Sequence, residues 1–113
     1  MSPTIEYEQF SKVDIRIGTI VKAELSTALN KPSIVLQIDF GNEIGIKKSS
    51  AQLTINYKAE NLIDKQIAAV VNFKPKQIGN IISEVLVLGF PDDNIEPILF
   101  SPDERIKNGA KLY

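Results

Sequence analysis

Residues 47–52 are the part of this chain best equipped to bind another molecule. Their polar groups belong to Lys47, Lys48, Ser49, Ser50 and Gln52. Two ammonium groups beside hydroxyl and amide groups can grip the phosphates of a nucleic acid or the backbone of a peptide. The run holds no nucleophile paired with a base, as covalent catalysis requires. It therefore predicts a binding module, with these groups at the end of a strand.

Each of these side chains also has a purely structural explanation. Lys47 and Lys48 are compatible with a solvated strand end, and Ser50 could cap a following helix. In the functional interpretation the lysines contact phosphates and release counterions, so binding weakens with salt. Ser49, Ser50 and Gln52 would then donate to phosphate, ribose or base edges. Spacing alone leaves both interpretations open.

A second polar group surrounds Pro75. Lys74 and Lys76 flank the proline, which either holds two charges in place or simply ends a strand. Other hydrogen-bonding side chains in this region are Asn72, Ser83 and Glu84. Of these, Ser83 and Glu84 could read a base or bind a peptide backbone. We treat all of them as candidate RNA contacts.

Isoleucines accompany these polar groups. Ile78, Ile81 and Ile82 surround the turn signal at residues 79–80, where turn residues are normally polar. Together with Ile46 they could line an apolar groove that holds an extended polypeptide. We treat these four residues as candidate peptide contacts.

The composition narrows the chemistry further. The 113 residues include neither cysteine nor histidine, which excludes disulfides, thiolate catalysis and histidine-based acid–base chemistry. Asp92 and Asp93 form the closest acidic pair, and their place between Pro91 and Asn94 predicts a solvated turn. We therefore expect no enzymatic activity, no metal and no cofactor.

Charge is distributed unevenly although the net charge is −1. Residues 43–80 carry six lysines against three acidic residues, whereas residues 81–113 carry three basic residues against six acidic ones. A basic middle can attract an anionic partner even when the pI is acidic.

Residues 1–10 lack the apolar core of a signal peptide, and no stretch approaches the roughly 20 apolar residues of a membrane helix. We expect a cytoplasmic protein without membrane insertion.

The apolar pattern predicts an all-β domain with short helices. Strands are expected at 13–25, 34–40, 43–48, 66–73 and 83–90, a loop at 26–32, and helices at 4–12 and 59–63. Thr4 would cap the first helix, with Ile5 and Phe10 facing inward. Gly18 in mid-strand predicts a bend or bulge. Arg16 is expected to pair with Glu84 or Asp14.

Five short strands with a helical connection after the third are typical of the five-stranded OB-fold barrel. An SH3-like barrel is the alternative, and the helical connection disfavours it. We expect one domain over 1–113, with a core at about 13–90 and extensions at 1–12 and 91–113. Phe40 and Phe73 are expected in the core, and Tyr57 is the better candidate for an exposed stacking residue.

The last two expected strands, 66–73 and 83–90, are apolar on both faces. One face can fill the core of the barrel. The other face must be covered by a terminal segment or by a second subunit.

Motifs across nearly the whole chain resemble one family. The matching segments are 10–20, 38–53, 62–67, 70–79 and 83–90. They are similar to the tRNA-binding domain found at the C-terminus of methionyl-tRNA synthetases and in stand-alone tRNA-binding proteins. Gln77-Ile78-Gly79 and Ser83-Glu84-Val85 stand where the wider family tends to have an Arg-Gly-rich turn and a Ser-x-Gly-Met segment. This version resembles the CsaA family of export-related chaperones.

The resemblance implies a homodimer built on an OB barrel, with residues 47–52 in the RNA-facing region. Two functions remain open: a chaperone that binds unfolded or exported polypeptides, and a structure-specific tRNA-binding protein without a chaperone role. One cleft could present both charge and apolar surface. A third possibility is a purely structural dimerisation module.

Overall fold

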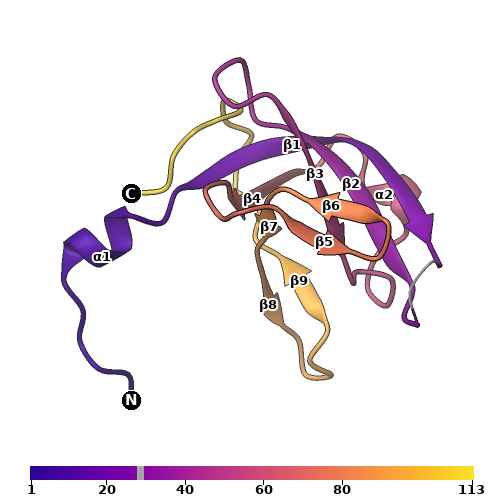
Figure 1. The fold of residues 1–113 in the computed structure, drawn as a ribbon, viewed down its shortest axis with the longest axis horizontal. Coiled ribbons are helices and arrows are strands. Elements are labelled where there is room, and N and C mark those ends of the chain that lie inside the picture. Colours follow the sequence, from indigo (N-terminus) through magenta and orange to yellow (C-terminus); the bar gives the residue numbers. More distant parts are fainter. Residues whose placement is uncertain (28–29) are drawn as a thin grey trace.

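The computed structural model describes residues 1–27 and 30–113 (Figure 1). A five-stranded antiparallel sheet in the order β3-β2-β1-β4-β7 curls into a half-barrel. Its strands are β1 (Ile15–Ser26), β2 (Ser33–Asp39), β3 (Ile46–Ala51), β4 (Gln66–Val70) and β7 (Leu86–Val87). Two small hairpins pair β5 (Lys76–Ile78) with β6 (Ile81–Ser83), and β8 (Gly89–Pro91) with β9 (Pro97–Leu99).

Two short helices complete the fold. Helix α1 (Tyr7–Ser11) precedes the sheet, and α2 (Ala59–Leu62) lies in the connection between β3 and β4. This arrangement confirms an OB-like fold, with the helical connection where the sequence predicts it. No helix in the described residues has the length and apolar character needed to cross a membrane. Of the loop expected at 26–32, residues 28–29 lie outside the described part of the chain.

The core is built mainly from one face of β2. Ile34, Leu36, Ile38 and Phe40 alternate along the chain, and all four are buried. Because successive strand residues point to opposite faces, this period of two places every second side chain inside. The alternation and the core position of Phe40 are confirmed.

Gly18 serves a different purpose from the expected bend. A Cβ at this position would lie 2.5 Å from Ile38 and 2.8 Å from Phe40, so the glycine lets β1 pack directly against the side chains of β2. The irregularity in β1 falls instead between Ile20 and Lys22. It leaves Ile20 buried and Val21 exposed, so the irregularity decides which residues of β1 face the core.

The N-terminal helix is shorter than predicted and does not enter the core. It begins after Glu6 rather than Thr4, and the Glu6 N–H donates to Gln9 Oε1 at 2.9 Å. Ile5 is exposed and Phe10 only half-buried, so the inward-facing pair is wrong for Ile5. The helix projects away from the barrel at the end of an extended segment (Figure 1).

The positions predicted for two aromatic residues are wrong, because each depends on structure beyond the local sequence pattern. Phe73 is 54% exposed because β4 ends at Val70, three residues earlier than expected. Tyr57 is half-buried against the core, and its hydroxyl oxygen accepts a hydrogen bond from the Leu99 N–H at 3.0 Å. Neither position follows from the local pattern alone.

The strand expected at 83–90 is divided between β7 and β8, and β5 and β6 form an additional hairpin around Gly79. Asp92 lies in the turn between β8 and β9, as the sequence predicts. The C-terminal segment, residues 105–113, runs along β1 rather than along the last strands. Its hydrogen bonds include those from Gly109 N–H to Ile17 C=O and from Ile17 N–H to Ala110 C=O.

Candidate functional site

The polar run at 47–52 forms part of a strand instead of following one. Strand β3 begins at Ile46 and ends at Ala51, so only Gln52 lies beyond it. Successive side chains of the run therefore point to opposite faces of the sheet. Ser49 is buried, whereas Lys48 is exposed and Ser50 half-buried. The run cannot present all its groups to one ligand.

Four serines form a cluster between β2, β3 and β6. The Ser83 hydroxyl accepts from the Ser50 N–H at 3.2 Å and contacts the Ser49 hydroxyl at 3.4 Å. The Ser50 hydroxyl contacts that of Ser33 at 3.3 Å. Ser49 is 2% exposed and Ser83 is 9% exposed, so we withdraw both as direct ligand contacts. Ser50 does not cap α2 either, because the residue before that helix is Lys58.

Glu84 connects the end of β6 to β3. Its carboxylate accepts from the Lys48 N–H at 3.0 Å, and its own N–H donates to the Lys48 carbonyl at 2.8 Å. The same carboxylate lies 4.0 Å from the Lys47 ammonium. Glu84 thus brings the two ends of the half-barrel together and offsets one of the two adjacent lysine charges.

Arg16 pairs with Asp14 and not with Glu84. The Arg16 guanidinium donates to the Asp14 carboxylate at 2.6 Å, and this hydrogen bond is the main cause that raises the pKa of Arg16. The guanidinium also donates to the Gly109 carbonyl at 3.0 Å. This ion pair is therefore structural, and it fixes the C-terminal segment to β1.

Asn72 also has a structural role. Its amide oxygen accepts from the Asp14 N–H at 3.0 Å, and its amide nitrogen donates to the Lys12 carbonyl at 2.8 Å. Both ends of the amide are thus occupied with the segment that leads into β1. We withdraw Asn72 as a direct RNA contact.

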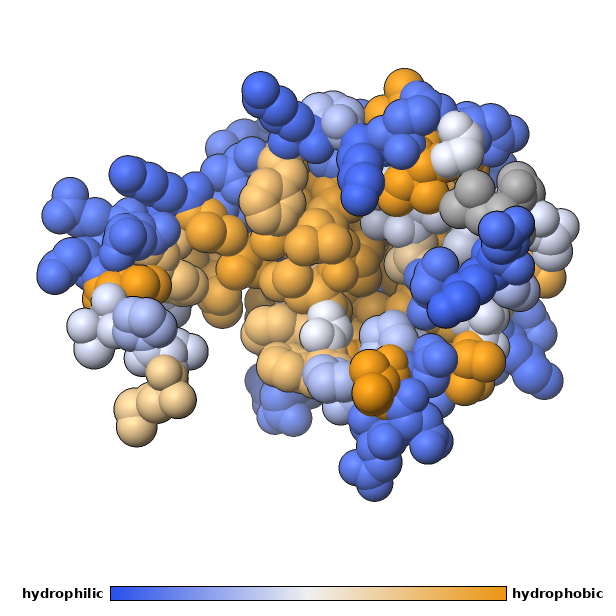
Figure 2. Space-filling model, turned by 60° about the horizontal axis from the view of Figure 1, so that its bottom comes forward, coloured by the Kyte–Doolittle hydropathy of each residue, from blue (hydrophilic) through white to orange (hydrophobic). Residues whose placement is uncertain are grey.

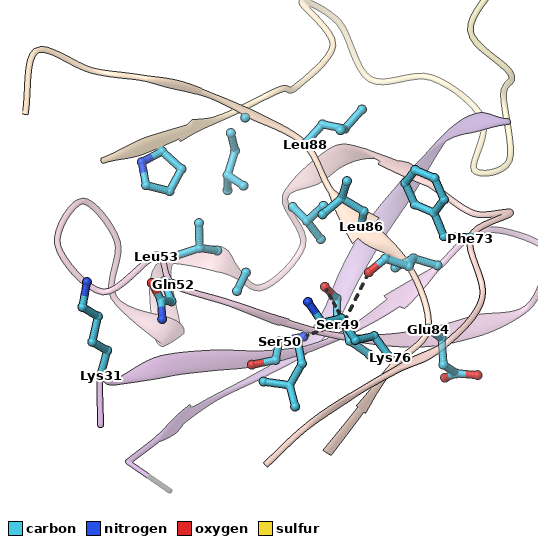
Figure 3. Close-up of a pocket in the computed structure, with 18 of the residues that line it drawn as sticks. Lys31, Ser49, Ser50, Gln52, Leu53, Phe73, Lys76, Glu84, Leu86 and Leu88 are labelled. Carbon is cyan, nitrogen blue, oxygen red and sulfur yellow. Dashed lines mark hydrogen bonds between the residues drawn. The ribbon is translucent and has the colours of Figure 1, made fainter. Parts of the chain in front are cut away.

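A groove of about 890 Å³ opens where β3 and β7 diverge beyond Glu84 (Figure 3). Its volume lies within the range of typical ligand-binding clefts. Of the candidate residues, it is lined by Ser49, Ser50, Gln52, Lys74, Lys76, Ile78, Ser83 and Glu84. The remaining candidates lie outside it: Ile46, Lys47, Lys48, Asn72, Ile81 and Ile82. Of the two lysine pairs, the groove wall therefore includes only Lys74 and Lys76.

Much of the groove lining is apolar and was not predicted from the sequence. These residues include Leu53, Phe73, Val85, Leu86, Leu88 and Ile95. Leu86 is 50% exposed, and Figure 3 shows it with Leu88 on one side of the groove and Gln52 and Leu53 on the other. The signal in the sequence is the strand pattern at 83–90, which is apolar on both faces.

Charged groups lie among this apolar lining. Lys31, Lys74 and Lys76 are exposed on the lining, and Glu84 and Glu96 are half-buried there. The site suits a partner with apolar groups and some negative charge. Within residues 1–27 and 30–113, no cluster of three or more acidic side chains is placed to hold a metal ion.

Comparison with known proteins agrees with this architecture. The chain matches the family described as "Putative tRNA binding domain" over residues 15–111, and it belongs to that family. It is 44% identical to the chaperone CsaA of Bacillus anthracis, with a TM-score of 0.92 over 98% of this chain and 100% of that one. It is 49% identical to the CsaA chaperone protein of Picrophilus torridus, with a TM-score of 0.90 over 97% and 100%.

The chain is also homologous to part of a much longer protein. It is 34% identical over 108 residues to the methionine–tRNA ligase of Pyrococcus furiosus. The alignment covers 96% of this chain and only 14% of the ligase. The relationship therefore concerns the tRNA-binding domain of the ligase.

Proposed function

We propose that this protein is a chaperone that binds unfolded polypeptides in the groove between β3 and β7. The observation that carries the proposal is the groove itself, whose walls expose leucine, valine and phenylalanine side chains beside strand edges. Burying one such side chain contributes roughly 1.5–3 kcal/mol, so several buried together can offset the cost of ordering a short apolar segment. The similarity to CsaA chaperones supports the same role.

The role we propose is binding, without covalent chemistry. Its clients would be polypeptides kept unfolded before export, and its compartment the cytoplasm. Cell fractionation checks the compartment. Capture of radiolabelled precursor proteins, compared with their mature forms, checks the preference for exported clients.

A direct test uses a labelled, permanently unfolded polypeptide and measures fluorescence anisotropy. The variant Leu86→Glu places a charge on the apolar wall and should weaken binding at least about tenfold, because the apolar contact is lost. Leu25→Glu is a matched control, since Leu25 is also an exposed strand leucine but lies outside the groove. Equal binding by both variants would place the polypeptide site elsewhere.

A second candidate function is tRNA binding, which the family match favours. Lys74 and Lys76 lie on the groove wall, and Lys47 and Lys48 extend from β3 beside Glu84. Each lysine that contacts a phosphate would steepen the salt dependence of binding by close to one unit of the logarithmic slope. This proposal assigns the lysines, with Ser50 and Gln52, to the RNA.

The test is a salt series with labelled bulk tRNA. We expect K74A/K76A to weaken binding more than K47A/K48A, because Glu84 partly neutralises Lys47. Absence of binding at low salt would remove RNA as a main partner. Polypeptide that displaces tRNA from the wild-type protein would show that the two ligands share the groove.

We further propose that the protein is a homodimer. Figure 2 shows a broad apolar area at the centre of one face, with polar side chains around it. Helix α1 has no buried residue, although Tyr7 and Phe10 pack against each other. A five-residue helix is not stable alone in water, so a docked position against a second copy explains its apolar side chains.

Sedimentation equilibrium tests the dimer. Tyr7→Ser combined with Phe10→Ser should shift the protein towards the monomer, because it removes the apolar face of α1. The double variant Ile55→Ser and Ile63→Ser is a control for exposed apolar residues near α2. A wild-type protein that sediments as a monomer at micromolar concentration would exclude a stable dimer.

A further inference from the structure

Strands β3 and β7 are the two outer strands of the five-stranded sheet, and they face each other across the groove. Strand β3 first meets the end of β6 and the link that leads to β7, through Lys48 with Glu84 and through the Ser50 N–H with the Ser83 hydroxyl. Beyond that point the strands separate, and the groove lies between them (Figure 3). The backbone N–H and C=O groups on the outer side of such a strand have no neighbouring strand to bond with.

The register of β3 shows which of its backbone groups point into the groove. The Phe40 N–H donates to the Gly45 carbonyl, and β2 then pairs Leu36 with Ser49 and Ile34 with Ala51. Hydrogen-bonded pairs alternate along an antiparallel ladder, so residues 47, 49 and 51 bond to β2. Lys48 and Ser50 therefore direct their N–H and C=O groups away from β2, and the Gln52 N–H, which lies opposite the Ala51 carbonyl in the same trans peptide unit, points the same way.

Part of this outward row is already occupied. Both backbone groups of Lys48 bond to Glu84, and the Ser50 N–H bonds to Ser83. Within the described part of the chain, the Ser50 carbonyl and the Gln52 N–H have no protein partner. They lie at the groove, as both residues line it.

The opposite wall, formed by β7, also directs backbone groups into the groove. The Leu88 N–H donates to the Ala68 carbonyl, and β4 pairs Val70 with Leu86. By the same alternation, Val87 directs its N–H and C=O away from β4, and Val87 lines the groove. No partner for these two groups exists among the described residues. Two unpaired strand edges thus border one apolar groove.

We propose that an extended polypeptide segment binds in this groove as an additional β-strand, with its backbone hydrogen-bonded to Ser50, Gln52 and Val87. The proposal rests on the polypeptide-binding function and specifies how the site recognises its ligand. A peptide backbone repeats its N–H and C=O groups every two residues, about 6.6–6.8 Å, which matches the spacing of the edge groups. Strand addition gives affinity for the backbone itself and so accepts many sequences.

The lining also defines the preferred side chains. Alternate residues of an added strand would point towards Leu53, Val85 and Leu99 at the base of the groove, which favours apolar side chains there. The lysines Lys74 and Lys76 on the wall favour an acidic residue at the flank of the segment. The preferred ligand is thus an extended segment with alternating apolar residues and an acidic end.

The test replaces backbone N–H groups of a ligand without changing its shape. The probe is a labelled peptide about as long as an ordinary strand, roughly six residues, with alternating valine and threonine and a terminal glutamate. Two further versions carry ester in place of amide bonds at odd or at even positions, which removes those N–H donors. We expect each ester version to bind roughly threefold to tenfold more weakly than the parent, because one set loses the N–H donor to the Ser50 carbonyl and the other the donor to the Val87 carbonyl.

A change in the protein provides the complementary test. The Leu53 N–H bonds to the Ala51 carbonyl around Gln52, and Gln52 has a negative φ, so this tight turn tolerates proline. Gln52→Pro removes the proposed N–H donor and should weaken peptide binding roughly threefold to tenfold. Gln52→Ala removes only the side chain and should bind within about twofold of wild type. Circular dichroism checks that both variants are folded.

The outcomes separate the two proposals. If both ester peptides bind within about twofold of the parent, strand addition is wrong while polypeptide binding stands. Equal affinity of Gln52→Pro and Gln52→Ala would overturn the role of the Gln52 N–H. If neither the parent peptide nor an unfolded polypeptide binds, the proposed function itself fails.

Discussion

The first residues of β1, which extend beyond its pairing with β2, and the outer side of β3 both need hydrogen-bond partners for their backbone, and they obtain them in opposite ways. Beside β1, the C-terminal segment supplies the partners, with hydrogen bonds to the backbone of Ile15 and Ile17. Beside β3, Lys48 bonds to Glu84 and the Ser50 N–H bonds to Ser83, and the groove begins beyond these bonds. The chain closes one edge of its sheet and leaves the other available.

The contacts at the closed edge are specific as well as numerous. The Gln66 side chain donates to the Ile106 carbonyl at 2.6 Å and accepts from the Ile106 N–H at 3.0 Å. The Thr19 hydroxyl donates to the Asn108 side chain at 2.7 Å. These bonds are made by buried groups, whose loss is expensive. We therefore expect stability to depend on the closed edge and binding to depend on the open one.

The largest effect on stability should come from Gly109→Ala. Gly109 has a φ of 89°, and a Cβ would lie 2.6 Å from the Phe40 carbonyl oxygen. Backbone strain and a clash with main-chain atoms together should lower the free energy of unfolding by about 3 kcal/mol, releasing the C-terminal segment from β1. Urea denaturation followed by circular dichroism measures the loss.

Gly45→Ala is the matched control for that variant. Gly45 has a similar φ of 84°, but nothing lies within 4 Å of the added Cβ. It should lower the free energy of unfolding by only about 1 kcal/mol, the cost of the backbone conformation alone. If the two variants were equally stable, the packing of the C-terminal segment against Phe40 would contribute nothing.

The next effect should come from Gln66→Ala, also at the closed edge. Gln66 is buried, and its amide makes hydrogen bonds to Ile106 and Asn108. Its removal should lower the free energy of unfolding by about 2 kcal/mol. Hydrogen exchange should then accelerate at the amides of Gly109 and Leu112, which bond to β1. Polypeptide binding should remain within about twofold of wild type, because the groove is untouched.

A smaller effect on stability, with a change in binding, is expected at the open edge. Glu84→Gln keeps the side-chain oxygen that accepts from the Lys48 N–H but removes the charge that faces Lys47. Because that ion pair is partly exposed, the loss of stability should be within about 0.5 kcal/mol. Binding of tRNA should tighten, and its salt dependence should steepen by about one unit of logarithmic slope.

Glu84→Ala completes this comparison. It removes the acceptor as well as the charge, so it should also lower the free energy of unfolding by about 1 kcal/mol. Equal tRNA affinity for wild type, Glu84→Gln and Glu84→Ala would show that Lys47 does not contact RNA. Anisotropy in a salt series and urea denaturation provide both readouts.

The elements that the sequence predicts well are those set by local periodicity. The alternation of Ile34, Leu36, Ile38 and Phe40 gives β2 and its buried face, because burial of one face imposes a period of two. The helical connection at α2 and the turn at Asp92 follow from similarly local signals.

The groove depends on contacts distant in sequence, which periodicity does not report. Glu84 meets Lys48 and Ser83 meets Ser50 only after the sheet has curled, and these contacts decide where β3 and β7 diverge. The same contacts bury Ser49 and Ser83, which the sequence presents as polar ligands. Phe73 shows the converse, since a residue in phase with the core becomes exposed once β4 ends early.

The smallest expected effect on stability is at the turn between β8 and β9, beside the open edge of β3. The Asp92 carboxylate accepts from the Glu96 N–H at 2.9 Å, from the Asn56 side chain at 2.9 Å and from the Asn94 N–H at 2.8 Å. These bonds favour the charged form and lower the pKa of Asp92 below its ordinary value of 3.8.

A lowered pKa in the folded state means that the unfolded state takes up a proton first as the pH falls. The stabilisation by Asp92 is therefore complete above about pH 3.8 and is lost as the pH falls through the lower folded pKa. Asp92→Asn should flatten this part of the stability curve, while Asp93→Asn, at the exposed neighbouring position, should leave it unchanged. Urea denaturation between pH 2 and pH 5 measures the difference, and parallel curves for wild type and Asp92→Asn would show that this turn is not held by the ionised carboxylate.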